Sequence, residues 1–133
     1  MIFVDTSASF ASIVPDDTDH SIATAWLGSN REVLITSDFI VDETLTLLRA
    51  RSEDRYAIQM GRSFFGSELA QIVRIEETDF LGAWDAFQRF TDKGWSFTDC
   101  TSKVMMERLG IDIAFAFDRH FTQFGTVKLV PST

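Results

Sequence analysis

Short apolar runs alternate along the chain with longer segments of helical periodicity. The apolar runs, each short enough for a buried strand, cover residues 2–4, 33–35, 72–75, 113–117 and 127–130. The segments between them carry apolar residues three and four positions apart, as on one face of a helix. Strands that alternate with helices favour a parallel sheet covered on both faces, so we expect an α/β fold.

Capping signals help to place the helices. Ser37 is expected to cap a helix whose apolar face runs from Ile40 to Leu48, and Gly110 to close a helix that starts near Asp99. A long helix is expected over residues 53–69.

No repeat, low-complexity tract or linker interrupts the pattern, so we expect one domain over residues 1–133.

The composition indicates a globular protein of a reducing compartment. Hydrophobic residues make up 45% of the 133 residues, including 13 Phe and 3 Trp, which supports a well-packed core. The one cysteine, Cys100, excludes an internal disulfide and a cysteine zinc cluster. The acid at position 5 is foreign to a signal peptide, and no apolar run approaches the ~20 residues of a membrane span. We therefore expect a cytoplasmic protein without a membrane segment.

The formal net charge of −8 counts against nucleic-acid binding, because phosphate contacts usually need a basic surface. A site built from clustered acids is a partial answer, since bound divalent ions cancel such charge.

Two acids directly follow apolar runs, Asp5 and Asp118. In open parallel sheets, ligands bind outside the carboxyl ends of the strands, so both acids are candidates for one site. Ordinary turn chemistry is the alternative for either one alone.

Two further acids are expected on helices. Asp99 begins a helix, where the dipole favours a negative charge, although it can equally serve only to stabilise that helix. At 100° per residue Glu43 lies beside Ile40 and Leu47, at the edge of an apolar face, whereas Asp42 points to solvent. A carboxylate at such an edge is costly unless it reaches water, pairs with an arginine or binds a cation. Mg²⁺ is commonly held by a few carboxylates, and two such ions ~4 Å apart can promote hydrolysis of a phosphodiester.

Four segments, in order, resemble the four blocks of PIN-domain nucleases, and the size and order are most similar to VapC-type toxins of toxin–antitoxin pairs. The segments are Phe3-Val4-Asp5-Thr6-Ser7, Val41-Asp42-Glu43-Thr44-Leu45, Ser96-Phe97-Thr98-Asp99 and Ala116-Phe117-Asp118-Arg119-His120-Phe121.

The resemblance implies a three-layer fold with a central parallel sheet, and cleavage of RNA that depends on Mg²⁺ or Mn²⁺. It implies a homodimer silenced by a cognate antitoxin. It assigns the metal site to Asp5, Glu43, Asp99 and Asp118, with the hydroxyls of Thr6 and Ser7 in support. The sequence departs from many relatives in lacking a hydroxyl at Ala116 and an acid near His120 or Gln123, and this loss is expected to weaken a second metal position while the four acids remain.

Cations near these segments are candidate phosphate contacts, with ordinary surface cations as the alternative. They are Arg49, Arg51, Lys103 and Arg119. The expected mechanism is in-line attack of water on an RNA phosphate, which needs no nucleophilic His or Cys.

Other conspicuous residues receive ordinary interpretations. His20 is expected to be solvated, Cys100 to be a small buried residue, and His120 to touch substrate only as a minor alternative. Trp26 and the pair Phe64-Phe65 fit the core better than base stacking or antitoxin binding.

Three rival classes are weighed against this interpretation. Phosphotransferases similar to haloacid dehalogenases carry Asp-x-Asp after the first strand, whereas this chain has Asp5-Thr6-Ser7. The paired acids and late lysine of receiver modules and the G-x-G-x-x-G of dinucleotide binding are also missing. A protein that keeps the fold and acids but acts mainly as an RNA- or protein-binding partner remains an alternative.

Overall fold

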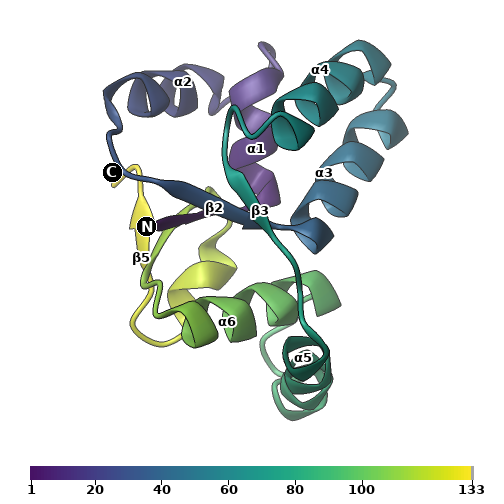
Figure 1. Cartoon of the computed structure of the whole chain (residues 1–133), viewed down its shortest axis with the longest axis vertical. Coiled ribbons are helices and arrows are strands. Elements are labelled where there is room, and N and C mark those ends of the chain that lie inside the picture. The colour runs from purple at the N-terminus through teal and green to yellow at the C-terminus, as the bar shows by residue number, and fades with distance from the viewer. Residues whose placement is uncertain (133) are drawn as a thin grey trace.

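A single five-stranded parallel sheet forms the centre of the molecule (Figure 1). The computed structural model describes residues 1–132, so the last residue of the expected domain, 133, lies outside the described residues. In the order β3-β2-β1-β4-β5, the strands are Gln71–Val73, Leu34–Ser37, Ile2–Val4, Ile113–Phe115 and Lys128–Val130. All four neighbouring pairs are parallel, which confirms the predicted α/β class.

Helices cover both faces of the sheet and give the three layers that the resemblance implied. Helices α1 to α4 lie on one side, and α5 and α6 on the other (Figure 1). Their bounds are α1 Thr6–Ile13, α2 His20–Ser29, α3 Asp38–Ala50, α4 Asp54–Phe65, α5 Glu77–Arg89 and α6 Phe97–Leu109, and a short 3₁₀ helix, η1, covers Arg119–Gln123.

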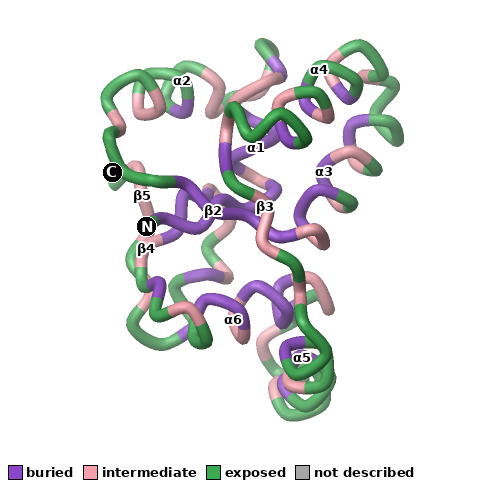
Figure 2. Tube along the Cα trace, viewed as in Figure 1, coloured by how far each residue is buried: buried purple, intermediate pink, exposed green. Residues whose placement is uncertain are grey.

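The central strands are buried on both faces, as Figure 2 shows. Successive side chains of a strand point to opposite faces. Phe3 accordingly packs with residues of α6 and η1, whereas Ile2 and Val4 pack with alanines of α1 and α2. This burial explains why the strands read as continuous apolar runs in the sequence.

Both predicted helix caps are confirmed. The Ser37 hydroxyl accepts a hydrogen bond from the Ile40 N–H at 3.1 Å, and Gly110 follows α6 with a φ of +68°, which glycine adopts without strain. The expected long helix over 53–69 is too long by five residues, one at its start and four at its end. Helix α4 ends at Phe65 because the chain turns through Ser67, whose φ is +55°, and the Glu68 N–H returns to the Ser63 carbonyl.

Two strands end earlier than predicted because side chains capture the next backbone N–H groups. The strand expected over 72–75 covers Gln71–Val73, and the Ile75 N–H donates to an Asp38 carboxylate oxygen at 2.9 Å. The strand expected over 113–117 ends at Phe115, and the Phe117 N–H donates to the Ser7 hydroxyl at 2.9 Å.

Helix α6, which carries Asp99, is tied to α5 by an ion pair. Arg108 donates to both carboxylate oxygens of the fully buried Asp79, at 2.8 and 2.9 Å. Burial raises the pKa of Asp79, but hydrogen bonds from Arg108 and from the Glu76 N–H outweigh it and leave the pKa below its usual value. The ion pair therefore fixes the position of α5 relative to α6 on their side of the sheet.

The strand order reverses between β1 and β4. From β1 the chain proceeds outward through β2 to β3, whereas β4 and β5 lie on the other side of β1. Such a reversal opens a crevice at the carboxyl ends of the two strands. Within residues 1–132, no helix is long and apolar enough to cross a bilayer.

Candidate functional site

The crevice at the end of β1 is occupied by Asp5, which is only 3% exposed. Asp5 is the N-cap of α1: one carboxylate oxygen accepts the Ser7 N–H at 3.1 Å and the Ser7 hydroxyl at 2.6 Å. Its own N–H donates to the Phe115 carbonyl of β4 at 3.0 Å. The sheet and the helix start together fix this carboxylate.

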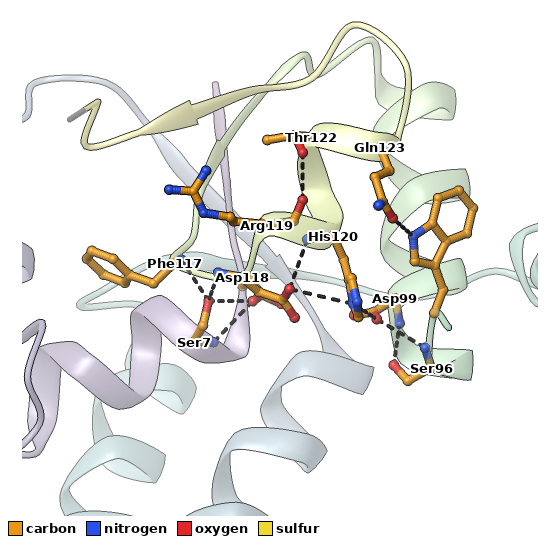
Figure 3. A network of polar contacts seen from close by, with 11 residues as sticks. Ser7, Ser96, Asp99, Phe117, Asp118, Arg119, His120, Thr122 and Gln123 are labelled. Carbon is orange, nitrogen blue, oxygen red and sulfur yellow. Dashed lines mark hydrogen bonds and ion pairs between the residues drawn. The ribbon is translucent and has the colours of Figure 1, made fainter. Parts of the chain in front are cut away.

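The Ser7 hydroxyl joins two parts of the site (Figure 3). While it donates to Asp5, it accepts the backbone N–H of Phe117 at 2.9 Å and that of Asp118 at 3.3 Å. The segment after β4 is thereby held against the start of α1. Ser7 was expected only to support Asp5. Its contact with the segment after β4 is one that the sequence did not predict.

Asp99 and Asp118 are both positioned by helix starts. Asp99 is 7% exposed and forms a capping box with Ser96: its carboxylate accepts the Ser96 N–H at 3.0 Å, and its own N–H donates to the Ser96 hydroxyl at 3.0 Å. Asp118 is the N-cap of η1 and accepts the His120 N–H at 2.9 Å. Asp118 lies three residues beyond the end of β4 rather than directly after the strand, because β4 is shorter than predicted.

Glu43 lies on α3 at the edge of its buried face, as the helical geometry predicted, and comes close to the other acids. Glu43 is half-buried, whereas Asp42 is exposed. Burial raises the pKa of Glu43, and the charges of Asp99 and Asp118 add to this, although the hydroxyls of Thr6 and Thr98 oppose it. Thr6 is thus near a second carboxylate, and Thr98 is a neighbour that the sequence analysis missed.

The raised pKa of Asp5 indicates a site in which no lysine or arginine of the described chain balances the carboxylates. Burial raises the pKa of Asp5 from 3.8 to about 7; the Ser7 hydroxyl and N–H oppose the shift, and the charge of Asp99 adds to it. Within residues 1–132, no Lys or Arg forms an ion pair with any of the four predicted acids. A set of carboxylate oxygens without a Lys or Arg partner fits a hard divalent cation.

One residue to which the sequence analysis gave a minor role lies inside the site. His120 Nδ1 is 3.2 Å from Asp99 Oδ2 and 3.5 Å from Asp118 Oδ1 (Figure 3). The available sequence signal was its position two residues after Asp118. The 3₁₀ turn that brings the imidazole back over the carboxylates was not predicted.

The four candidate RNA-contacting cations divide into two pairs. Arg51 lines a small hollow together with Ser7 and Asp118, and Arg119 is exposed directly after Asp118, with its side chain directed to the same side as Phe117 (Figure 3). Two others are paired away from these acids, Arg49 with Asp54 at 3.1 Å and Lys103 with Glu107.

The remaining expectations have mixed outcomes. Cys100 is fully buried, as predicted. His20 is half-buried rather than solvated, because its Nδ1 lies 2.7 Å from the Ala11 carbonyl oxygen. Trp26 stacks on Phe115 and Phe64 is buried, but the adjacent Phe65 is 75% exposed, so the core assignment was wrong for that residue.

Comparison with known proteins identifies the family. The sequence matches the PIN domain over residues 2–126. It is 34% identical over 134 residues to the "23S rRNA-specific endonuclease VapC20" of two Mycobacterium tuberculosis strains, CDC 1551 / Oshkosh and ATCC 25618 / H37Rv, with 98% of this chain and 99% of VapC20 covered. The crystal structure of M. tuberculosis VapC20, described as a Sarcin-Ricin loop cleaving toxin, matches with a TM-score of 0.89 and 31% identity over 96% of this chain and 97% of that chain. The chain therefore belongs to the PIN-domain family, as a homologue of the endonuclease VapC20.

Proposed function

We propose that this protein is an endoribonuclease that hydrolyses phosphodiesters of ribosomal RNA with the help of Mg²⁺ or Mn²⁺. The observation that carries the proposal is the convergence of acids from four separate segments. Burial raises the pKa of Asp5 and Glu43, and the charge of Asp99 adds to both shifts, where no Lys or Arg among residues 1–132 forms an ion pair with the acids. A bound divalent cation removes that repulsion. We assign the cation to Asp5, Glu43, Asp99 and Asp118.

The substrate class follows from the relatives. VapC20 is named for cleavage of 23S rRNA and is described as cutting the Sarcin-Ricin loop, and this chain matches it over nearly its whole length. We propose a structured loop of ribosomal RNA as the substrate, with Arg51 and Arg119 contacting phosphates beside the acids. A ribosomal substrate makes the cytoplasm the site of action.

Each side chain has a distinct role in the proposed reaction. A divalent cation, when bound, makes hydroxide available near neutral pH and neutralises charge that develops on the phosphate. Glu43 is half-buried and burial raises its pKa above the usual value, which makes its carboxylate a stronger base and suits it to accept the proton of the attacking water. Ser7 holds Asp5 and the Asp118 segment in register.

The surface supports the expected protein partners. On α5 several large apolar side chains are exposed, and on α4 the side chain of Phe65 is 75% exposed. Contiguous exposed apolar surface commonly marks protein contacts. We propose that the protein forms a homodimer and is silenced by a cognate antitoxin. The exposed apolar residues of α5 are Phe80, Leu81, Trp84 and Phe87.

A cleavage assay tests the activity. Purified protein is incubated with ribosomal RNA in Mg²⁺, in Mn²⁺ and in EDTA, and the ends of the fragments are mapped. We expect discrete fragments only with a divalent ion, with 3′-hydroxyl and 5′-phosphate ends, because water rather than the ribose 2′-hydroxyl attacks. Fragments with 2′,3′-cyclic phosphate ends that form equally in EDTA would contradict the mechanism. Intact RNA beside a folded, cation-loaded protein would favour the binding-partner alternative.

A further inference from the structure

We propose that His120 binds the divalent cation directly through Nδ1, so that the site has a mixed nitrogen and oxygen ligand set and prefers Mn²⁺ to Mg²⁺. The proposal rests on the proposed function in one respect only, that the carboxylate cluster is the cation site. The assignment of ligands expected from the sequence contains four carboxylates and no nitrogen.

The ligand atoms are close enough to share one ion. One ligand atom each of Asp99, Asp118 and His120 lie within 4.8 Å of one another. In an octahedral complex with bonds of about 2.1 Å, ligand atoms are separated by about 3.0 Å when adjacent and about 4.2 Å when opposite. An ion therefore fits among the three side chains after shifts of about half an ångström.

The backbone presents these three groups without help from an ion. His120 is the second residue of η1, and its N–H donates to Asp118 Oδ1, so the imidazole and that carboxylate are fixed on one turn. Asp99 is fixed on α6 by the capping box with Ser96. Figure 3 shows the ring lying between the two carboxylates. The arrangement is therefore preorganised, as selective metal sites require.

Each carboxylate retains an oxygen for a cation. Asp99 Oδ2 accepts the Ser96 N–H, and Asp118 Oδ1 accepts the His120 N–H. In the described part of the chain, Asp99 Oδ1 and Asp118 Oδ2 accept no side-chain or N–H hydrogen bond. His120 Nδ1 faces both carboxylates, 3.2 Å from Asp99 Oδ2 and 3.5 Å from Asp118 Oδ1, and is the nitrogen donor of the proposed site.

The nitrogen donor changes which ion is preferred. Mg²⁺ strongly favours oxygen ligands, whereas imidazole binds first-row transition ions, with affinity rising from Mn²⁺ onward through the series. We expect wild-type protein to bind Mn²⁺ at least about tenfold more tightly than Mg²⁺, which corresponds to a free-energy difference of about 1.4 kcal/mol. His120→Asn should abolish most of this preference, and His120→Asp should shift it toward Mg²⁺.

Pulsed electron paramagnetic resonance of Mn²⁺-loaded protein tests the contact itself. A directly bonded imidazole nitrogen gives a characteristic hyperfine coupling to Mn²⁺, and we expect this signal in wild type and its loss in His120→Asn. The matched control is His20→Asn, because His20 is the only other histidine and lies against the Ala11 carbonyl. Circular dichroism and calorimetric titration establish that each variant is folded and give its affinities for both ions.

The outcomes separate this inference from the proposed function. Bound Mn²⁺ without a nitrogen coupling, with His120→Asn weakening Mg²⁺ and Mn²⁺ equally, would show that His120 only orients the carboxylates and would overturn the inference. Failure of folded protein to bind either ion would overturn both proposals. A nitrogen signal lost in His120→Asn supports the inference even if the protein cleaves no RNA, an outcome that would count against the proposed function alone.

Discussion

Asp99→Asn is expected to reduce RNA cleavage at least about 10³-fold and to leave the protein folded. Asp99 is central to the site: its Oδ2 lies 3.2 Å from His120 Nδ1, and its charge adds to the rise in pKa that burial causes at both Asp5 and Glu43. Loss of its charge removes cation binding, and with it the stabilisation of the transition state, several kcal/mol, that a bound ion supplies. A barrier higher by about 4 kcal/mol corresponds to a 10³-fold lower rate. Asparagine keeps an oxygen to accept the Ser96 N–H, so α6 retains its cap.

The initial rate of ribosomal RNA cleavage in Mn²⁺ measures this effect. Asp112→Asn is the matched control, because Asp112 is exposed and precedes β4, at the opposite end of that strand from Asp118. The control should cleave at the wild-type rate. If Asp99→Asn retained more than about a tenth of the wild-type rate while remaining folded, Asp99 would not hold the cation.

In EDTA, Asp5→Asn is expected to be more stable than wild type at neutral pH, by up to about 4 kcal/mol. The pKa of Asp5 is raised from 3.8 to about 7, chiefly by burial. The folded state therefore holds a proton that the unfolded chain releases between these values, so the contribution of Asp5 to stability falls as pH rises from about 4 to about 7. A shift of about 3 pKa units corresponds to about 4 kcal/mol. Asparagine is neutral throughout and keeps an acceptor for Ser7.

Urea unfolding at a series of pH values tests this linkage. The two proteins should be closest in stability near pH 4, and the advantage of Asp5→Asn should grow up to about pH 7 and then level off. Saturating Mn²⁺ should reverse the order, because the ion binds the wild-type folded state more tightly. An Asp5→Asn variant that is less stable than wild type at pH 7.5 in EDTA would show that the carboxylate is stabilised by contacts within the protein.

The four acids could be selected from the sequence because each has a local signal. Asp5 and Asp118 follow apolar runs, Asp99 stands at the start of a helix, and Glu43 lies on a helix face that 100° geometry predicts. These signals depend on neighbours within a few residues, so they can be recognised without knowledge of the tertiary structure. The same holds for the Ser37 cap and for Gly110.

The convergence of the acids could not be derived in this way. It depends on β4 pairing with β1, more than a hundred residues earlier, and on the reversal of strand order between them. His120 was underestimated for a related reason. The apolar run through Phe117 indicated a strand, but the Ser7 hydroxyl captures the Phe117 N–H and the chain turns into η1. A contact distant in sequence therefore ends the strand and directs the imidazole into the site.

The location of the bound ion tests the central claim most directly. Crystals grown with Mn²⁺ would be measured for anomalous scattering, which identifies the ion independently of the protein. We expect a peak in the crevice at the ends of β1 and β4, about 2.0–2.4 Å from oxygens of Asp99 and Asp118. A peak confined to exposed acids such as Asp16 or Asp85, with the crevice carboxylates still bonded only to protein groups, would contradict a cation-dependent site.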